Sequence, residues 1–417
     1  RTHPVYHLPP ATSTVRCHRG CIAISTPGPI FATMNLISSL LCVSLFCVVS
    51  TPGLAQFFFI HTDGEVLLQK GVGYIYNVRF DSARTQFDSV IQKYPDHPAG
   101  YFLDAMVEWW RINMDRMSRA YDADFLRRID RVLAVCDRAL AKDERDVTAL
   151  FFKGGALGFR GRYNVIRENY ISAATDGKDA LDILIACQKI APGNKDIMLG
   201  TGIYNYFAEA IPEKMPLLRP LLVFLPSGDK ELGLLQLRAA AKSARYASVE
   251  AMDVLYQVYD QFEKNPAEAM EWARQLHARY PDNPVFHRYY AKGLVTQSSI
   301  DSMEAEWRVI LTRCLDKHFG YERKTAREAL YYIGVALMRK RSLDMALTYF
   351  YKCDEGSRVL DEDPSGFMVR TNLQIGQIYD LQGKRDLAIK QYNKVLSWTD
   401  YGGSHAQAEQ YKRSPYK

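Results

Sequence analysis

The chain has 417 residues, of which 47% are apolar and 24% charged, with 26 glycines and 18 prolines. These values are ordinary for a folded protein and exclude a disordered chain. The first 55 residues hold three arginines and no acidic residue, so the rest carries 53 − 3 = 50 basic against 47 acidic groups, a net charge of +3. That balance argues against nucleic-acid binding through charge.

The N-terminal part predicts two segments that precede the folded chain. Residues 1–33, rich in Pro, Thr and His, resemble translated upstream sequence or a poorly defined start. Residues 34–55 are typical of a signal peptide, with an apolar core over 36–49, a Pro52-Gly53 break and small residues before Gln56. The apolar core is too short for a membrane span. We therefore expect export to the bacterial periplasm or cell envelope.

The remaining chain repeats one frame of small and aromatic residues. Its clearest copy, 373–396, has Gly376 and Tyr379 on a first helix, a turn at Gly383, and a stripe of Ala388, Tyr392 and Val395 on a second. Earlier copies begin at Gly71 and Gly334. This is the tetratricopeptide pattern and predicts an all-α solenoid of helical hairpins, a right-handed superhelix. The eight predicted hairpins are 64–95, 98–144, 147–192, 196–244, 248–281, 284–318, 324–358 and 366–400.

The solenoid is expected to form one domain, residues 56–402, followed by a capping helix and tail over 403–417. Its alanine positions 83, 180, 269, 346 and 388 are separated by 97, 89, 77 and 42 residues. A perfect array would give multiples of about 34. We therefore predict long helices or insertions around 164–176 and 211–228.

Four cysteines follow the predicted signal peptide, and none forms a CxxC pair. Cys187 and Cys353 occupy the slot where the repeat places a small packed residue, so burial is the expected role. The sequence also leaves open a disulfide between distant helices among Cys136, Cys187, Cys314 and Cys353.

A more specific pattern occupies Gly202–Ala241. It has a Gly-x-Tyr-Asn helix, a Pro-rich apolar stretch, a Gly-Asp turn and a Gly-Leu-x-x-Leu helix, formed by Gly202, Tyr204, Asn205, Pro216, Pro220, Pro226, Gly228, Asp229, Gly233, Leu234 and Leu237. This segment resembles the tetratricopeptide repeat protein 39 and inclusion-body clearance family. The resemblance implies an all-helical, non-enzymatic binding protein. The export signal departs from the eukaryotic members, so their intracellular roles are not carried over.

Motifs for catalysis, cofactor binding or metal binding are not found in the sequence. The turn 227–233 is better explained by a helix cap from Asp229 than by a phosphate site. The nine histidines are scattered, and His277 and His287 flank a turn without a metal-ligand pattern. The acidic run 354–363 lacks the alternating ligands of a calcium loop and is interpreted as a helix end and linker. We predict no enzyme, cofactor or metal.

Binding is therefore expected on the concave groove, which first-helix residues line. One groove position has only apolar residues or tyrosine, which disfavours a clamp for acidic peptides; its six members are Leu68, Phe151, Ile197, Val254, Tyr331 and Leu373. Trp109 and Trp110 cannot both face one neighbour, so one is expected in the core and the other is a candidate contact. Arg160, Arg162 and Tyr204 complete the candidate partner contacts.

The segment 211–226 admits three interpretations. Prolines 212, 216, 220 and 226 prevent a long helix, so the segment could cross the groove and cover its apolar lining. It could instead extend the core between hairpins four and five, or dip into a membrane.

The predicted function is a non-catalytic scaffold or adaptor that binds protein partners. The alternative is a carrier of an apolar ligand, a lipid or acyl chain, with 211–226 as lid. The partner's identity and the oligomeric state stay open.

Overall fold

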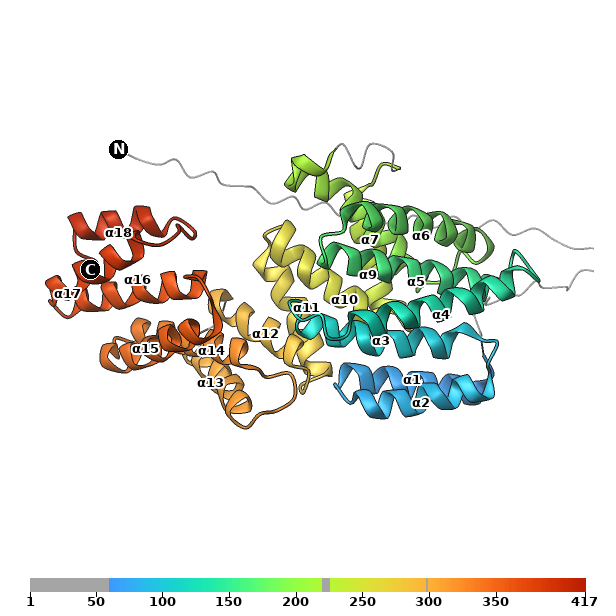
Figure 1. Ribbon diagram of the computed structural model, residues 1–417, viewed down its shortest axis with the longest axis horizontal. Coiled ribbons are helices and arrows are strands. Elements are labelled where there is room, and N and C mark those ends of the chain that lie inside the picture. Colours follow the sequence, from blue (N-terminus) through green and yellow to red (C-terminus); the bar gives the residue numbers. More distant parts are fainter. Residues whose placement is uncertain (1–59, 220–225, 298) are drawn as a thin grey trace, which may run out of the picture. The chain divides into compact units, whose positions relative to one another are not determined.

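The computed structural model describes residues 60–219, 226–297 and 299–417, and the regular elements in these ranges are all helical. Eight antiparallel hairpins follow one another along the chain (Figure 1), and α18 (Ser404–Arg413) comes after the last. The predicted all-α fold of helical hairpins is confirmed. The pairs are α1 (Thr62–Tyr76) with α2 (Phe80–Lys93), α3 (Pro98–Met114) with α4 (Asp122–Leu140), α5 (Val147–Ile166) with α6 (Tyr170–Ile190), α7 (Ile197–Lys214) with α9 (Lys230–Ser243), α10 (Ser248–Gln257) with α11 (Pro266–Arg279), α12 (Pro284–Gln297) with α13 (Ile300–Leu315), α14 (Arg323–Arg339) with α15 (Leu343–Leu360), and α16 (Gly366–Leu381) with α17 (Arg385–Leu396).

Close approach of two helices explains the repeating glycine frame. A Cβ atom added to Gly71 would lie 2.3 Å from the ring of Phe87, and one added to Gly376 would lie 2.5 Å from Tyr392. The second helix therefore lays an aromatic ring directly on the backbone of the first. Beside these rings, Ala83 and Ala388 are fully buried, because only a small side chain fits between two helices at this distance.

The irregular repeat spacing comes mainly from helix length. Helices α5 and α6 have 20 and 21 residues, and only three residues separate them, so the excess around 164–176 is helix and not an insertion. In the second predicted insertion, around 211–228, α7 continues to Lys214 with Pro212 inside it. The short 3-10 helix η1 (Pro216–Leu218) follows. A π-helix, η2 (Val258–Phe262), extends α10.

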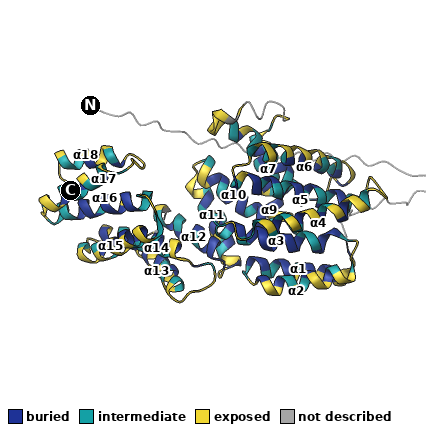
Figure 2. Ribbon diagram, in the orientation of Figure 1, coloured by how far each residue is buried: buried dark blue, intermediate teal, exposed yellow. Residues whose placement is uncertain are grey.

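Two parts of the chain differ in how their cores are built. In the N-terminal region, residues 60–290, one large apolar cluster joins side chains from Ile60 to Tyr289, and a small separate cluster holds Leu150, Leu184, Cys187 and Ile197. In the C-terminal region, residues 291–417, the clusters run from Ala291 to Ile378 and from Val369 to Ala408. Buried residues cover nearly the whole length of α3 and α16 (Figure 2), so these helices are enclosed by neighbours on most sides.

The predicted upstream segment 1–33 and signal peptide 34–55 lie outside the described residues. None of the helices that the structure describes has the length and hydropathy to cross a membrane.

All four cysteines after the predicted signal peptide are free thiols. Cys187 and Cys353 are fully buried in the small-residue slot, as predicted. Burial raises the pKa of the Cys187 thiol to about 12, so this side chain is an unreactive packing group.

Candidate interaction surfaces

The six predicted groove positions all lie on first helices, as expected, but their side chains are packed inside the protein. Five of them are buried and Phe151 is half-buried. Val254, for example, belongs to the large N-terminal cluster, and Tyr331 contacts the rings of Phe350 and Phe367. As partner contacts these positions stay a prediction. In this structure they are core.

The two adjacent tryptophans of α3 pack against different sets of residues, and both are about 1% exposed. Trp109 makes ring contacts with Phe125 and Phe159. Trp110 meets Phe286 of α12 edge to face at 5.3 Å, and its Nε1 donates a hydrogen bond of 2.6 Å to Glu250 of α10. Contrary to the expectation that one tryptophan is a surface contact, neither offers a free face.

First-hairpin residues reach hairpins that are far along the chain. Tyr246, just before α10, donates a hydrogen bond to Glu65 of α1, and Arg245 pairs with the same carboxylate at 2.6 Å. Asn283 donates from Nδ2 to the carbonyl of Tyr76 at 3.0 Å. These contacts span 181 and 207 residues of sequence. The inner face of the N-terminal region is therefore filled by its own hairpins.

The remaining candidate contacts are also engaged. Arg160 forms a two-pronged pair with Asp176, at 2.7 and 3.0 Å. Arg162 pairs with Glu250 at 3.1 Å and lies over the ring of Trp109. The hydroxyl of Tyr204 donates to the carbonyl of Pro226 at 2.9 Å. Each side chain thus has an internal partner that accounts for its position.

Asp253 of α10 is a fully buried carboxyl close to Glu250. Burial, with the neighbouring Glu250 charge, raises the pKa of Asp253 to about 6, and the charges of Arg162 and Arg116 oppose this shift only in part. Its Oδ2 accepts a hydrogen bond from Gln257 at 2.7 Å. The ionised form of Asp253 is therefore unfavourable in the folded protein, and protonation of this carboxyl removes the cost.

In the described part of the segment 211–226, Ile211 and Pro212 are half-buried and the residues after them are more exposed. Leu217 is 94% exposed and Met215 is 44% exposed. Residues 220–225, on which the lid and core interpretations also depend, lie outside the described residues.

The pattern over Gly202–Ala241 makes a close helix pair. An added Cβ at Gly233 would lie 2.6 Å from the amide nitrogen of Tyr206, and one at Gly228 would lie 2.4 Å from the Asn205 carbonyl oxygen. Asp229 caps α9 by accepting from the Leu232 amide at 2.8 Å, which confirms the predicted cap. In the described residues, the motif's glycines and aspartate serve to pack α7 on α9.

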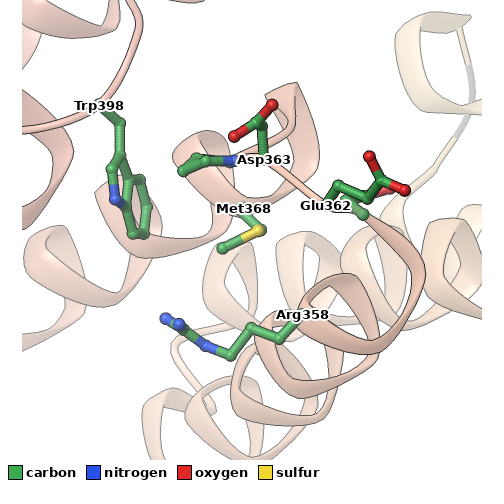
Figure 3. A pocket seen from close by; sticks show the side chains of 7 residues that line it. Arg358, Glu362, Asp363, Met368 and Trp398 are labelled. Atoms are coloured by element: carbon green, nitrogen blue, oxygen red, sulfur yellow. The ribbon is translucent and has the colours of Figure 1, made fainter.

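A hollow of about 270 Å³ lies in the C-terminal region, between the α15–α16 linker and the residues after α17. Met368 and Trp398 supply its apolar surface, with Met368 between Trp398 and Arg358 (Figure 3). The other lining residues are Asp361, Glu362, Asp363 and Pro364. The predicted helix end and linker over 354–363 is confirmed, because α15 ends at Leu360.

The charges around this hollow are only partly compensated. Asp361 accepts from Arg327 at 2.5 Å, and Arg358 pairs with Asp354 at 3.1 Å. Glu362 and Asp363 are exposed, and neither forms an ion pair with another described residue. The hollow thus places the half-buried ring of Trp398 and the cation of Arg358 beside two uncompensated carboxylates, where the sequence indicates only a solvated linker.

The structure brings His277 and His287 together, which no feature of the sequence predicts. Their rings stack at 4.7 Å, and Glu306 of α13 joins them. The two histidines come from α11 and α12, so only the hairpin packing makes them neighbours.

Comparison with known families supports the repeat at the end of the chain. Residues 369–400 match the tetratricopeptide repeat, and this segment covers most of α16 and all of α17. Among curated proteins, no sequence matches the chain.

Several solved structures resemble the fold. A thermophilic TPR protein of Thermus thermophilus is 16% identical, with 56% of this chain and 99% of that chain covered and a TM-score of 0.35. A Rap protein complexed with competence and sporulation factor is 14% identical, with coverage of 83% and 78% and a TM-score of 0.34. The human IFIT1 dimer with PPP-AAAA is 14% identical, with coverage of 76% and 68% and a TM-score of 0.36. These values carry no inference about function.

Proposed function

We propose that this chain is a non-catalytic protein–protein interaction module, a scaffold or adaptor of the bacterial periplasm or cell envelope. Tetratricopeptide repeats generally bind proteins, and one such repeat forms the last hairpin. The observation that carries the proposal is the hollow beside that repeat, where Met368 and Trp398 adjoin the free carboxylates of Glu362 and Asp363.

The chemistry of this hollow selects the kind of partner. An aromatic ring and a methionine thioether favour an apolar side chain, since both are adaptable contact groups. Two neighbouring carboxylates favour a cationic side chain next to it. The proposed partner is therefore a protein segment that carries Lys or Arg beside an apolar residue.

The location rests on the sequence of residues 34–55, and the family resemblance on residues 202–241. Together they favour an exported bacterial relative of the tetratricopeptide repeat protein 39 and inclusion-body clearance family. Both remain parts of the proposal. Mass spectrometry of the protein from its native cells tests the first, since a mature N-terminus at Gln56 supports export and an intact 34–55 segment contradicts it.

The alternative function, a carrier of an apolar ligand, requires an open apolar groove. The positions expected to line that groove are packed against the protein's own helices, and most of the described part of 211–226 is exposed. Since no observation in the described residues favours a carrier, the adaptor is the better-supported function.

Site-specific crosslinking tests the proposal. A photo-crosslinking amino acid replaces Glu362 in one variant and, as matched control, Glu355 in another; both positions are exposed and acidic, and they lie seven residues apart. We expect the same one or two proteins to be captured at position 362 in native cells and not at position 355. Capture should fall in a Trp398→Ala background.

Equal capture at both positions, or none at 362, would overturn the hollow as the docking site. Bound lipid without any captured protein would favour the carrier instead.

A further inference from the structure

We propose that His277, His287 and Glu306 form a binding site for a divalent metal ion of the zinc type, which would link hairpins five and six. The three residues come from three helices, α11, α12 and α13. Their potential ligand atoms all lie within 4.8 Å of one another.

The donor set suits zinc. Two imidazole nitrogens and one carboxylate oxygen are a common set of protein ligands for Zn²⁺, with a fourth position left for water. Ligand bonds of about 2.0–2.1 Å in a tetrahedral arrangement place the donor atoms roughly 3.3 Å apart. The Nε2 atom of His277 lies 3.9 Å from Oε1 of Glu306, and that of His287 lies 2.5 Å from the same oxygen. Small side-chain movements would bring both separations to the required value.

The ring of His277 stacks on the rings of His287 and Tyr290 but has no hydrogen-bond partner within the described residues. No hydrogen bond from its ring is found there, and its Nδ1 is buried without a partner. Its Nε2 faces the Glu306 oxygen at a distance too long for a hydrogen bond. A half-buried imidazole without a polar partner is costly. A shared ion would give Nε2 a partner, and Nδ1 would then carry the proton of the ring.

His287 has the support that metal-binding histidines usually have. Its Nδ1 lies 2.8 Å from the hydroxyl of Tyr321, which also accepts a hydrogen bond from Arg313 at 2.8 Å. In the ion-free state Tyr321 can donate to Nδ1 while Nε2–H donates to Glu306. When the ring proton moves to Nδ1, Tyr321 becomes the acceptor, and the Nε2 lone pair is free for the metal. This exchange needs no net gain or loss of protons.

The site can be reached from solvent. The side chains of His277 and Glu306 are 19% and 24% exposed, while His287 is 1% exposed. An ion would therefore meet Glu306 and His277 first. His277 stacks between His287 and Tyr290, so its ring must turn partly out of this stack to direct its lone pair at the ion.

Calorimetric titration of the full chain with Zn²⁺, after removal of bound metal by a chelator, tests the proposal. We expect one ion per chain, and with Co²⁺ the visible absorption of a tetrahedral site. His277→Phe keeps an aromatic ring in the stack and removes the nitrogen, so it should weaken binding by at least about 100-fold without unfolding the protein. Glu306→Gln should have a similar effect, and Tyr321→Phe a smaller one of about 10-fold.

His318→Ala is the matched control, because His318 is exposed and its ring lies near Tyr321 without joining the cluster. Binding should be unchanged in this variant. Circular dichroism checks that each variant is folded. The proposal is overturned if the wild-type chain binds no Zn²⁺ or Co²⁺, or if His277→Phe binds as tightly as wild type.

Discussion

The N-terminal and C-terminal regions are built from the same hairpin but are stabilised differently. In the N-terminal region, residues separated by 140 to 207 positions meet, as the side chains of Trp110 and Glu250 do, and as the Asn283 side chain does with the backbone carbonyl of Tyr76. Within the C-terminal region, polar contacts join nearby hairpins, such as Arg308 with Tyr349 and Tyr416 with Asp380. A simple solenoid has only neighbour contacts.

A repeat array therefore gains cooperativity when its inner face is filled by its own helices. In the N-terminal region, loss of one hairpin removes contacts from several others. In the C-terminal region, hairpins can open from the end inward with less loss. The proposed docking hollow lies at the last two hairpins, within this less cooperative region.

The substitution Trp110→Ala should have the largest effect on stability, and this effect should be confined to the N-terminal region. It removes a fully buried indole that meets Tyr76 and Phe286, and it leaves the Glu250 carboxylate without one of its donors. We expect a loss of about 3–5 kcal/mol in the free energy of unfolding of the N-terminal region, measured by urea titration with circular dichroism. Hydrogen exchange should show the loss across α1, α3, α10 and α12 together.

Trp398→Ala is the control for this change, since Trp398 is half-buried in the C-terminal hollow. Its effect should stay below about 1 kcal/mol. Faster exchange confined to α3 in Trp110→Ala would contradict the view that the N-terminal region is one cooperative unit.

Deletion of residues 404–417 should affect only the C-terminal region. Ala408 of α18 is buried against the last hairpin, and Tyr411 contacts the ring of Tyr392. Their removal exposes the outer face of α17 and should lower the stability of hairpin eight by roughly 2–4 kcal/mol. Hydrogen exchange should become faster in α16 and α17 while α1–α12 stay unchanged. A uniform loss over the whole chain would show that the regions are coupled.

Most of the fold could be predicted from the sequence because hairpin packing is local. The glycine and alanine frame at Gly376 and Ala388 indicates directly which helices touch and how closely. The helix cap at Asp229 was predictable for the same reason, since a cap needs only residues of its own turn.

The self-filled interior could not be predicted, because it depends on where distant hairpins meet. Nothing near Trp110 in the sequence indicates Glu250, and nothing near Glu65 indicates Arg245. The same holds for the candidate sites: His277 and His287 become neighbours of Glu306 only through the packing of three helices. The hollow at Trp398 also joins two separate stretches of sequence.

The pH dependence of stability should separate the regions, with an effect centred on Asp253. The pKa of Asp253 is about 6 in the folded protein, against an ordinary value of 3.8. The folded state therefore binds more protons than the unfolded state between these values. The contribution of Asp253 to stability is largest at low pH and is lost as the pH rises through 6.

Asp253→Asn should therefore stabilise the N-terminal region at pH 7.5 by roughly 1–3 kcal/mol, because the amide needs no ionisation. The difference from wild type should shrink as the pH falls from 7 to 4. Urea titrations at several pH values measure both quantities, with Asp316→Asn as an exposed control. A stabilisation that does not change with pH would contradict this explanation.

The smallest expected effects lie in turns between paired helices, where one residue takes the left-handed conformation, as Val78 does in the N-terminal region with φ 53° and as two residues do in the C-terminal region. Gly383 has φ 73° and Arg341 has φ 62°, and the amide after each donates back to the preceding helix, from Lys384 to Tyr379 and from Ser342 to Leu337. This conformation costs a non-glycine residue about 1–2 kcal/mol, whereas a glycine adds about 0.5–1 kcal/mol of backbone entropy to the unfolded state.

Arg341→Gly should therefore stabilise hairpin seven by at most about 1 kcal/mol, and Gly383→Ala should destabilise hairpin eight by about 1 kcal/mol. No atom lies within 4 Å of a Cβ added at Gly383, so backbone strain alone decides the sign. Neither change touches the inner face of the N-terminal region, so hydrogen exchange in that region should stay the same in both variants. A change in exchange there would show that a turn in the C-terminal region is coupled to the N-terminal region.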